Sequence, residues 1–429
     1  MFYSDMYYIL LFLLPPSLCV SPPAEEIASS VVPAVISAMK NSSWLHYRNY
    51  GSWSYEGGVI TRGLWEISHT FQDSNLETFL HQHLNYFIED PDEFGFRILH
   101  NESLTYNGTS MFLPWLYSIG DNIGLFPIVY GDRHSYATMS DLYSQEQDLY
   151  ILSEVVDKYI YGYPWHLPDG TISRPITWLS EGFLEPHGTG VWVDDMFMGT
   201  AVLVEWAKIT GDVEYLEYAC WQLKRITEYL YREEHEDGLL HHGYNFWTGD
   251  LSCCKWGRGN GWAFIAMTEV LEAGQKMAAE LDILDHLLLM YRRHASGLLA
   301  VQSAEGRWHN ILNNNNTFLE TSASAMFLTG LARGLRYGWL EEDDDIILDS
   351  IERAWSAVAG EVNEDGTIDG IIGGTGIKDT EDDYAPDNTD YSKASPGVGA
   401  VLRAVAEIAV LQHNYGLRFR QLNRVIHND

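Results

Sequence analysis

Two adjacent carboxylates, Asp194 and Asp195, stand where the apolar residues 191–193 lead into a run that is apolar nearly all round. The run continues to about Ala207 and predicts a buried helix with acid at its mouth. An aspartate at a helix start ordinarily caps unpaired backbone N–H groups, and Asp195 would also meet the positive end of the helix dipole. Carboxylates in such a place also suit acid–base chemistry. The segment alone leaves both interpretations open.

A second candidate lies in residues 255–262, KWGRGNGW. Glycines on both sides of Arg258 permit positive φ and close backbone approach, so we expect a tight turn that displays Trp256, Arg258 and Trp262. A guanidinium in that position would bind a carboxylate through two hydrogen bonds. The alternative is a structural salt bridge to one of the 60 acidic side chains of the chain.

The other motifs argue against a metal or a cofactor. His241 and His242 follow the turn at Gly238 without the spacing of a zinc site. Residues 373–378 lack Walker A spacing, residues 364–387 lack EF-hand spacing, and the sequence has no G-x-S-x-G elbow. We therefore expect neither metal nor cofactor.

Six apolar segments led by small residues could position these groups. They recur roughly every 60 to 75 residues, as repeated helical units do, and begin near Gly58, Asn122, Asp195, Gly261, Ser322 and Gly397. Most precede a more amphipathic segment, most clearly residues 214–231. Glycine-containing turns are expected to close several units, at Gly170, Gly238, Gly297 and Gly366.

This pattern predicts an all-α fold, an (α/α)6 toroid of six helical hairpins in two concentric rings, as a single domain over residues 24–429. The loops that enter the inner helices would then meet at one mouth. The alternative architecture is an open α-solenoid, which does not require six similar units.

Composition restricts the classes of partner. The net charge is −34, and no basic stripe accompanies the aromatic residues, so nucleic-acid binding is not expected. Aromatic residues make up 13% of the chain. They suit either a carbohydrate-binding surface or a large helical core. The sequence does not indicate the oligomeric state.

The N-terminus predicts secretion. Residues 1–20 contain a short apolar run placed as in a signal peptide, although the basic segment usual before it is missing, and no other stretch suggests a membrane span. Four N-x-S/T triplets are compatible with secretion. Without the signal, Cys220, Cys253 and Cys254 remain. One bridge from Cys220 to the adjacent pair and three reduced thiols are equally compatible with the sequence.

Seven motifs follow one another from about Trp53 to the C-terminus: WSYEGG, GDN, VWVDDMFMGTAVLVEWAKITGD, DGLLHHGYN, KWGRGNGW, ETSASAMF and GGTGIKD. Because it contains these motifs in this order, the chain resembles the unsaturated rhamnogalacturonyl hydrolases of glycoside hydrolase family 105. These are related to the unsaturated glucuronyl hydrolases of family 88. The resemblance implies an (α/α)6 barrel. It also implies removal of a 4,5-unsaturated galacturonyl or glucuronyl residue from the non-reducing end of oligosaccharides left by polysaccharide lyases.

The resemblance also implies roles for single residues. It places the general acid on Asp194 and a second active-site aspartate on Asp121. Substrate-binding positions fall on Tyr55, His242, Trp256, Arg258 and Trp262. The implied reaction is protonation of the sugar's C4=C5 vinyl ether by Asp194, followed by addition of water at C5, and we expect burial and a nearby aspartate to raise the pKa of Asp194 for this task.

Two alternatives to this function remain. One is an ordinary glycosidase or sugar epimerase that acts on saturated sugars with the same toroid. The other is a toroid that binds carbohydrate without catalysis.

Overall fold

The computed structural model describes residues 22–41, 55–89, 105–106, 109–110, 156–163, 165–175, 189–231, 237–340, 345–384 and 395–415. The expected signal peptide (1–20), Asp121 and the segment from Asn122 lie outside these residues. Among the helices of the described part, none combines the length and the apolar character needed to cross a membrane.

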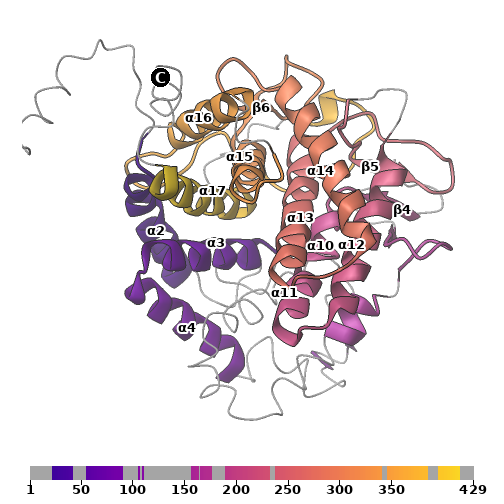
Figure 1. Ribbon diagram of the computed structural model, residues 1–429, viewed down its shortest axis with the longest axis horizontal. Helices are drawn as coiled ribbons and strands as arrows, with labels where there is room; N and C mark the ends of the chain where they lie inside the picture. The colour runs from indigo at the N-terminus through magenta and orange to yellow at the C-terminus, as the bar shows by residue number, and fades with distance from the viewer. Residues whose placement is uncertain are drawn as a thin grey trace, which may run out of the picture.

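Inner helices lined almost wholly by buried residues form the centre of the molecule (Figure 1). In the described residues they are α3 (Tyr55–Phe71), α11 (Ala201–Thr210), α13 (Gly257–Lys276), α15 (Thr321–Arg336) and α17 (Ser395–Tyr415). Along α13 and α15, nearly every residue is buried, because small and apolar side chains face neighbours on all sides.

Outer helices surround this ring and bury one face each. They are α2 (Ala24–Asn41), α4 (Ser74–Glu89), α12 (Val213–Leu230), α14 (Asp282–Ala300) and α16 (Asp345–Ala359). In α12 the buried positions Leu216, Ala219, Leu223, Ile226 and Leu230 recur at helical spacing. The alternation of inner and outer helices along the chain is the one expected for the predicted toroid.

The predicted helix from Asp195 is divided in two. A short helix, α10 (Asp195–Met198), ends at Gly199, and α11 starts anew at Ala201. The hydroxyl of Thr200 donates to the carbonyl oxygen of Met196, a side-chain contact that competes with regular helix pairing. The break separates the mouth of the ring from its interior.

The prediction of a turn at Gly297 is wrong. Gly297 lies inside α14, and a Cβ there would stand 2.0 Å from the carbonyl oxygen of Asp237, so glycine is required for close packing. The turn of this unit comes later, at Gly306, whose φ is +94°. The expected turns at Gly170, Gly238 and Gly366 all have positive φ and are confirmed.

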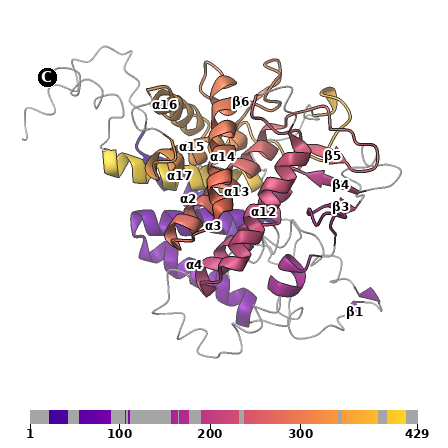
Figure 2. The ribbon, with the colours of Figure 1, turned by 45° about the vertical axis from the view of Figure 1, so that its right-hand side comes forward.

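Short strands and turns connect the helices. They are β1 (Thr105–Tyr106), β2 (Thr109–Ser110), the π-helical turn η2 (Val156–Tyr161), β3 (Arg174–Pro175), β4 (Thr189–Trp192), β5 (Gly243–Asn245), β6 (Trp308–His309), β7 (Leu319–Glu320) and the 3₁₀ turn η4 (Asp382–Tyr384). Strands β3, β4 and β5 form an antiparallel sheet beside α12, as Figure 2 shows. This sheet lies directly before α10 and therefore fixes the entrance of that helix.

Deep in the inner ring, away from the helix N-termini, charged side chains from five inner helices form a buried ion-pair network. Arg62 of α3 binds Glu205 of α11 at 2.7 Å, and Arg403 of α17 binds Glu269 of α13 at 2.6 Å. The buried or half-buried members are five cations and five carboxylates: Arg62, Glu66, Glu205, Lys208, Glu269, Glu272, Arg333, Arg336, Arg403 and Glu407. The more exposed Lys276 also pairs with Glu272. Each buried charge has opposite charges around it, as burial requires.

Candidate active site

The small sheet brings Asp194 and His242 together. Trp192 of β4 pairs with Gly243 of β5, and the backbone N–H of Val193 donates to the carbonyl oxygen of His242 at 3.0 Å. Asp194 directly follows this register and His242 directly precedes Gly243. As a result, Nε2 of His242 lies 3.3 Å from Oδ2 of Asp194.

The side chain of Asp194 does not cap a helix. It is the N-cap residue of α10, but its side chain accepts no capping hydrogen bond. Its carboxylate retains 13% of its accessible surface, whereas the ring of His242 is fully buried. The capping interpretation is therefore wrong for Asp194, and the carboxylate is available for chemistry.

Asp195 has a different environment. Its side chain is fully buried and accepts two hydrogen bonds from Nε of Arg174, at 2.8 and 2.9 Å, with a further contact from a terminal nitrogen of the same guanidinium. Arg174 lies over the ring of Trp192 at 4.7 Å. Asp195 is thus one half of a buried ion pair, a larger role than the contact with the helix dipole expected from the sequence.

The pKa of Asp194 is shifted in the direction opposite to the one expected, and its neighbour Asp195 is shifted the other way. Burial acts to raise the pKa of Asp194, but the imidazole of His242 and the nearby guanidinium groups of Arg174 and Arg258 outweigh it and hold that pKa below its usual value. Burial raises the pKa of Asp195 instead, against the opposing effect of Arg174. The expected raised pKa of Asp194 is therefore wrong for the protein without substrate, because His242 and the arginines were not taken into account.

Arg258 lies in the first turn of α13, not in the tight turn expected. The flanking glycines have no positive φ; a Cβ on Gly259 would stand 2.4 Å from a methyl carbon of Val193, so glycine permits α13 to approach the strand that leads to Asp194. The guanidinium donates to the carbonyl oxygens of Ile372 and Gly373. Its positive charge lies close enough to Asp194 to affect the titration of that group.

The two tryptophans of KWGRGNGW are buried behind the site. Trp256 is 1% exposed, with His242 at 4.5 Å from its ring centroid and the Arg258 guanidinium at 4.8 Å. Trp262 is 2% exposed and stacks on Phe197 at 4.8 Å. The expected display of both rings from a tight turn is thus wrong, because they pack behind His242, Arg258 and α10; their contact with substrate remains a prediction.

Tyr55 begins α3 and is partly exposed. Its hydroxyl lies beside the backbone of Gly374, 3.8 Å from where a Cβ would stand. Burial and the neighbouring Glu56 raise the pKa of Tyr55, so it remains a neutral hydroxyl. Among the charges that act on it are Arg258 and Asp194, which places Tyr55 in the same site.

Several residues that position the site were not identified from the sequence. Asn260 of α13 binds both the backbone N–H and the carbonyl oxygen of Leu240 at 2.9 Å, which ties α13 to the irregular segment before His242. Glu320 caps α15 and lies 3.9 Å from Arg258. Asn260 stands within KWGRGNGW, and a polar residue amid glycines at a helix start was a usable signal. The sequence around Arg174 and Tyr384 contained no such signal.

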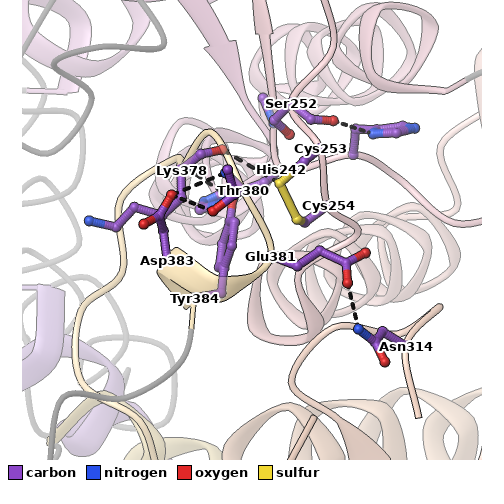
Figure 3. The surroundings of a disulfide bond; sticks show 12 residues. His242, Ser252, Cys253, Cys254, Asn314, Lys378, Thr380, Glu381, Asp383 and Tyr384 are labelled. Atoms are coloured by element: carbon purple, nitrogen blue, oxygen red, sulfur yellow. Dashed lines mark hydrogen bonds between the residues drawn. A yellow bond between two sulfur atoms is a disulfide. The ribbon is translucent and has the colours of Figure 1, made fainter. Parts of the chain in front are cut away.

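Neither expectation for the cysteines holds. The adjacent residues Cys253 and Cys254 form a disulfide with each other, and Cys220 is a buried thiol. The carbonyl oxygen of Cys254 accepts a hydrogen bond from the backbone N–H of His242 at 3.0 Å. The disulfide therefore lies in the segment that supports His242 (Figure 3).

The described residues do not include Asp121, so its expected role remains a prediction. Within those residues, no group of three or more His, Cys, Asp and Glu side chains is arranged to hold a metal ion. A hollow of about 570 Å³ lined by Gln275, Leu281 and Trp339 lies at the opposite end of α13 and is separate from the site.

Comparison with known proteins identifies relatives that carry out one class of reaction. The chain is 29% identical over 227 residues to the unsaturated 3S-rhamnoglycuronyl hydrolase of Alteromonas sp. (strain LOR), covering 51% of each protein. It is 26% identical over 194 residues to the unsaturated rhamnogalacturonyl hydrolase YesR of Bacillus subtilis (strain 168), covering 45% of this chain and 52% of that protein. The chain thus spans about half the length of these curated relatives.

A solved structure extends the similarity to nearly the whole chain. It is that of a possible member of the GH105 family from Salmonella enterica serovar Paratyphi A, with a TM-score of 0.72, 18% identity, and coverage of 97% of this chain and 100% of that one. At this identity the likeness concerns the fold, and the predicted (α/α)6 toroid is confirmed. The family model described as Glycosyl Hydrolase Family 88 matches residues 28–412, so the chain belongs to that family.

Proposed function

We propose that the protein removes a 4,5-unsaturated uronic acid from the non-reducing end of oligosaccharides produced by polysaccharide lyases. The observation that carries the proposal is the uncapped carboxylate of Asp194, at the mouth of a six-hairpin toroid, with Nε2 of His242 at 3.3 Å. The two curated relatives, both named as hydrolases of unsaturated uronides, support the substrate class.

The proposed reaction begins at the vinyl ether of the substrate. Asp194 donates its proton to C4, the C4=C5 π electrons form the new C–H bond, and positive charge develops at C5 and the ring oxygen. Water adds to C5 and gives a proton to the Asp194 carboxylate, which restores the acid. The resulting hemiketal opens to a ketone at C5 and leaves a hydroxyl group on C1, where the next sugar is still attached. This hemiacetal collapses to an aldehyde at C1, and the next sugar leaves as an alcohol that takes up the proton of that hydroxyl group.

One carboxylate is sufficient for this scheme, in contrast to ordinary glycosidases, which use two. Two other acidic side chains of the described site already bind groups of the protein itself. Asp195 is bound by Arg174, and Glu320 accepts hydrogen bonds from the Ser322 hydroxyl and the Ala323 N–H. This arrangement favours the unsaturated substrate over a saturated one. Asp121 is proposed as a further active-site group.

Binding of the substrate would raise the pKa of Asp194 and so favour its protonated form. In the unoccupied protein, His242 and two arginines hold the pKa of Asp194 low. A uronate brings a negative charge and displaces water, and both effects raise the pKa of a neighbouring carboxyl group. Protonation of Asp194 is thus coupled to arrival of the anionic sugar.

Arg258 is the proposed partner of the substrate carboxylate. A guanidinium has five N–H donors, and two are directed at the carbonyl oxygens of Ile372 and Gly373. These contacts fix its plane, and its remaining N–H groups are proposed to bind the uronate, although the side chain is only 2% exposed in the protein without substrate. Tyr55 and the backbone of Gly374 lie next to it and are proposed to complete the sugar site.

The test is a panel of lyase-generated disaccharides, followed by loss of ultraviolet absorbance from the C4=C5 bond. We expect the absorbance to fall with at least one member, and Asp194→Asn to abolish the change. Asp285→Asn, on the exposed face of α14, is the matched control and should retain full rate. Absorbance loss at the normal rate in Asp194→Asn, or hydrolysis restricted to saturated sugars, would refute the proposal. Secretion, proposed from residues 1–20, is checked separately by N-terminal sequencing of exported protein.

A further inference from the structure

The imidazole of His242 is enclosed on every side that the structure describes. Its ring is 0% exposed, with the rings of Trp192 and Trp256 at 5.7 and 4.5 Å. Nδ1 lies 2.7 Å from the hydroxyl oxygen of Tyr384, 142 residues further along the chain. Nε2 points to the opposite side, toward Asp194 at 3.3 Å. The two ring nitrogens therefore have different partners.

The hydrogen-bond donors determine which nitrogen carries the proton. The hydroxyl oxygen of Tyr384 accepts a hydrogen bond from the backbone N–H of Lys378 at 3.3 Å. Its own single proton is then directed at Nδ1 of His242, the other polar atom within reach in the described residues. A neutral imidazole that accepts at Nδ1 must carry its proton on Nε2, which faces Asp194.

Tyr384 is held firmly enough to impose this arrangement. Its ring is buried in a small apolar cluster with Cys254, Trp256 and Ile311. Its carbonyl oxygen accepts a hydrogen bond from the amide of Asn310 at 3.1 Å. Burial raises the pKa of its hydroxyl, so the group keeps its proton throughout the working pH range.

The disulfide joins the two sides of this arrangement, as Figure 3 shows for Cys253, Cys254, His242, Lys378 and Tyr384. The carbonyl oxygen of Cys254 binds the backbone N–H of His242 at 3.0 Å, while Sγ of Cys253 lies 3.6 Å from the carbonyl oxygen of Lys378. The same pair of residues thus contacts His242, directly before β5, and the loop that positions Tyr384.

We propose that Tyr384 is a positioning residue whose hydroxyl fixes His242 as the Nε2–H tautomer, so that an N–H group faces the carboxylate of Asp194 once that residue has given up its proton. The effect on catalysis rests on the proposed function, in which Asp194 is the acid; the tautomer itself does not. Without the Tyr384 hydroxyl, the proton is free to move to Nδ1, and a lone pair would then face the carboxylate.

Among the described residues, the other charges that act on this pair are those of Arg174, Arg258 and Asp195, and the test leaves them unchanged. Arg174 of β3 and Arg258 of α13 act on both His242 and Asp194. Both arginines favour the ionised carboxylate whichever tautomer is present. A change in the titration of Asp194 on removal of the Tyr384 hydroxyl can therefore be assigned to His242.

The first test needs no substrate. Nitrogen NMR of protein labelled in histidine distinguishes the two neutral tautomers, and the signals of His242 are assigned by their loss in His242→Gln. We expect the proton on Nε2 in the parent protein and a shift toward Nδ1 in Tyr384→Phe. The control is Tyr291→Phe, which removes another buried hydroxyl, one that donates to the carbonyl oxygen of Gly330 at 2.9 Å. A proton on Nδ1 in the parent protein overturns the proposal, even if Tyr384→Phe does not fold.

The second test uses the reaction. In Tyr384→Phe we expect kcat to fall about tenfold, the loss typical of one hydrogen bond, with a much smaller change in KM. The alkaline limb of kcat/KM should move to higher pH, because loss of the Nε2–H donor raises the pKa of Asp194. Parent-like kcat and pH profile in a folded Tyr384→Phe would refute the positioning role. If the parent protein acts on no unsaturated uronide, the function fails while the tautomer is still decided by NMR.

Discussion

Arg174 holds Asp195 through two hydrogen bonds from Nε, at 2.8 and 2.9 Å; Asp195 is fully buried and adjoins Asp194, the proposed general acid. This pair separates the roles of the two consecutive aspartates. Asp195 joins α10 to β3, whereas Asp194 faces His242.

Asp195→Asn is expected to act on stability. It leaves the guanidinium of Arg174 without its carboxylate in a largely buried position, which should lower the free energy of unfolding by about 3 kcal/mol. Chemical denaturation measures this, with Asp349→Asn as control, because the exposed Asp349–Arg353 pair should contribute less than about 1 kcal/mol. Equal losses in the two variants would show that Asp195 is not a structural anchor.

Arg258→Lys is expected to reduce kcat/KM by the equivalent of at least about 2 kcal/mol in transition-state stabilisation. Lysine keeps the charge but cannot donate to two carbonyl oxygens and the substrate in one fixed plane. Steady-state kinetics on an unsaturated disaccharide provides the measurement. Arg225→Lys, in an exposed ion pair with Asp169 on the outer ring, is the control. Unchanged kinetics in Arg258→Lys would reduce Arg258 to a structural residue.

The pH profiles of kcat and kcat/KM are expected to differ. A general acid works when protonated, so the rate falls as pH rises through its pKa. The low pKa of Asp194 in the unoccupied protein places the alkaline limb of kcat/KM at acidic pH. In the complex, the uronate raises that pKa, so the limb of kcat should lie at higher pH. Coincident limbs would contradict coupling between substrate charge and protonation.

Removal of one partner from the buried ion-pair network should lower the free energy of unfolding. Glu407 binds Arg333 at 3.1 Å and Arg336 at 2.6 Å, so Glu407→Gln leaves two guanidinium groups short of charge. We expect a loss of about 3 kcal/mol in thermal or chemical unfolding. Glu228→Gln, on the solvent face of α12 beside Lys224, should cost less than about 1 kcal/mol. A Glu407→Gln protein as stable as the Glu228→Gln control would contradict this assignment.

The fold could be predicted from sequence because its helices have strong local patterns. The segments beginning near Gly261 and Ser322 are small-residue-rich and apolar all round, which suits the helices that cross the centre of the ring. Single breaks were less predictable. Gly199 ends α10 and Gly297 sits within α14, and the difference depends on contacts with other helices, such as that of Gly297 with Asp237.

The site could be predicted only where one segment contains the signal. Asp194 and Arg258 stand in distinctive local patterns, and both lie at the site. The groups that lower the pKa of Asp194 stand in other segments of the chain: His242, Arg174 and Arg258. No local pattern indicates that these groups lie near Asp194, which is why the direction of the pKa shift of Asp194 was predicted wrongly.

The most direct test of the central claim, that Asp194 protonates C4, is hydrolysis of an unsaturated disaccharide in D₂O with NMR analysis of the released keto sugar. The mechanism predicts one deuterium at C4 in the parent protein. It also predicts a fall in kcat of at least the ~10²-fold expected on loss of a general acid in Asp194→Asn. Product without deuterium at C4 would contradict the hydration mechanism, and normal turnover by Asp194→Asn would contradict the assignment of the acid.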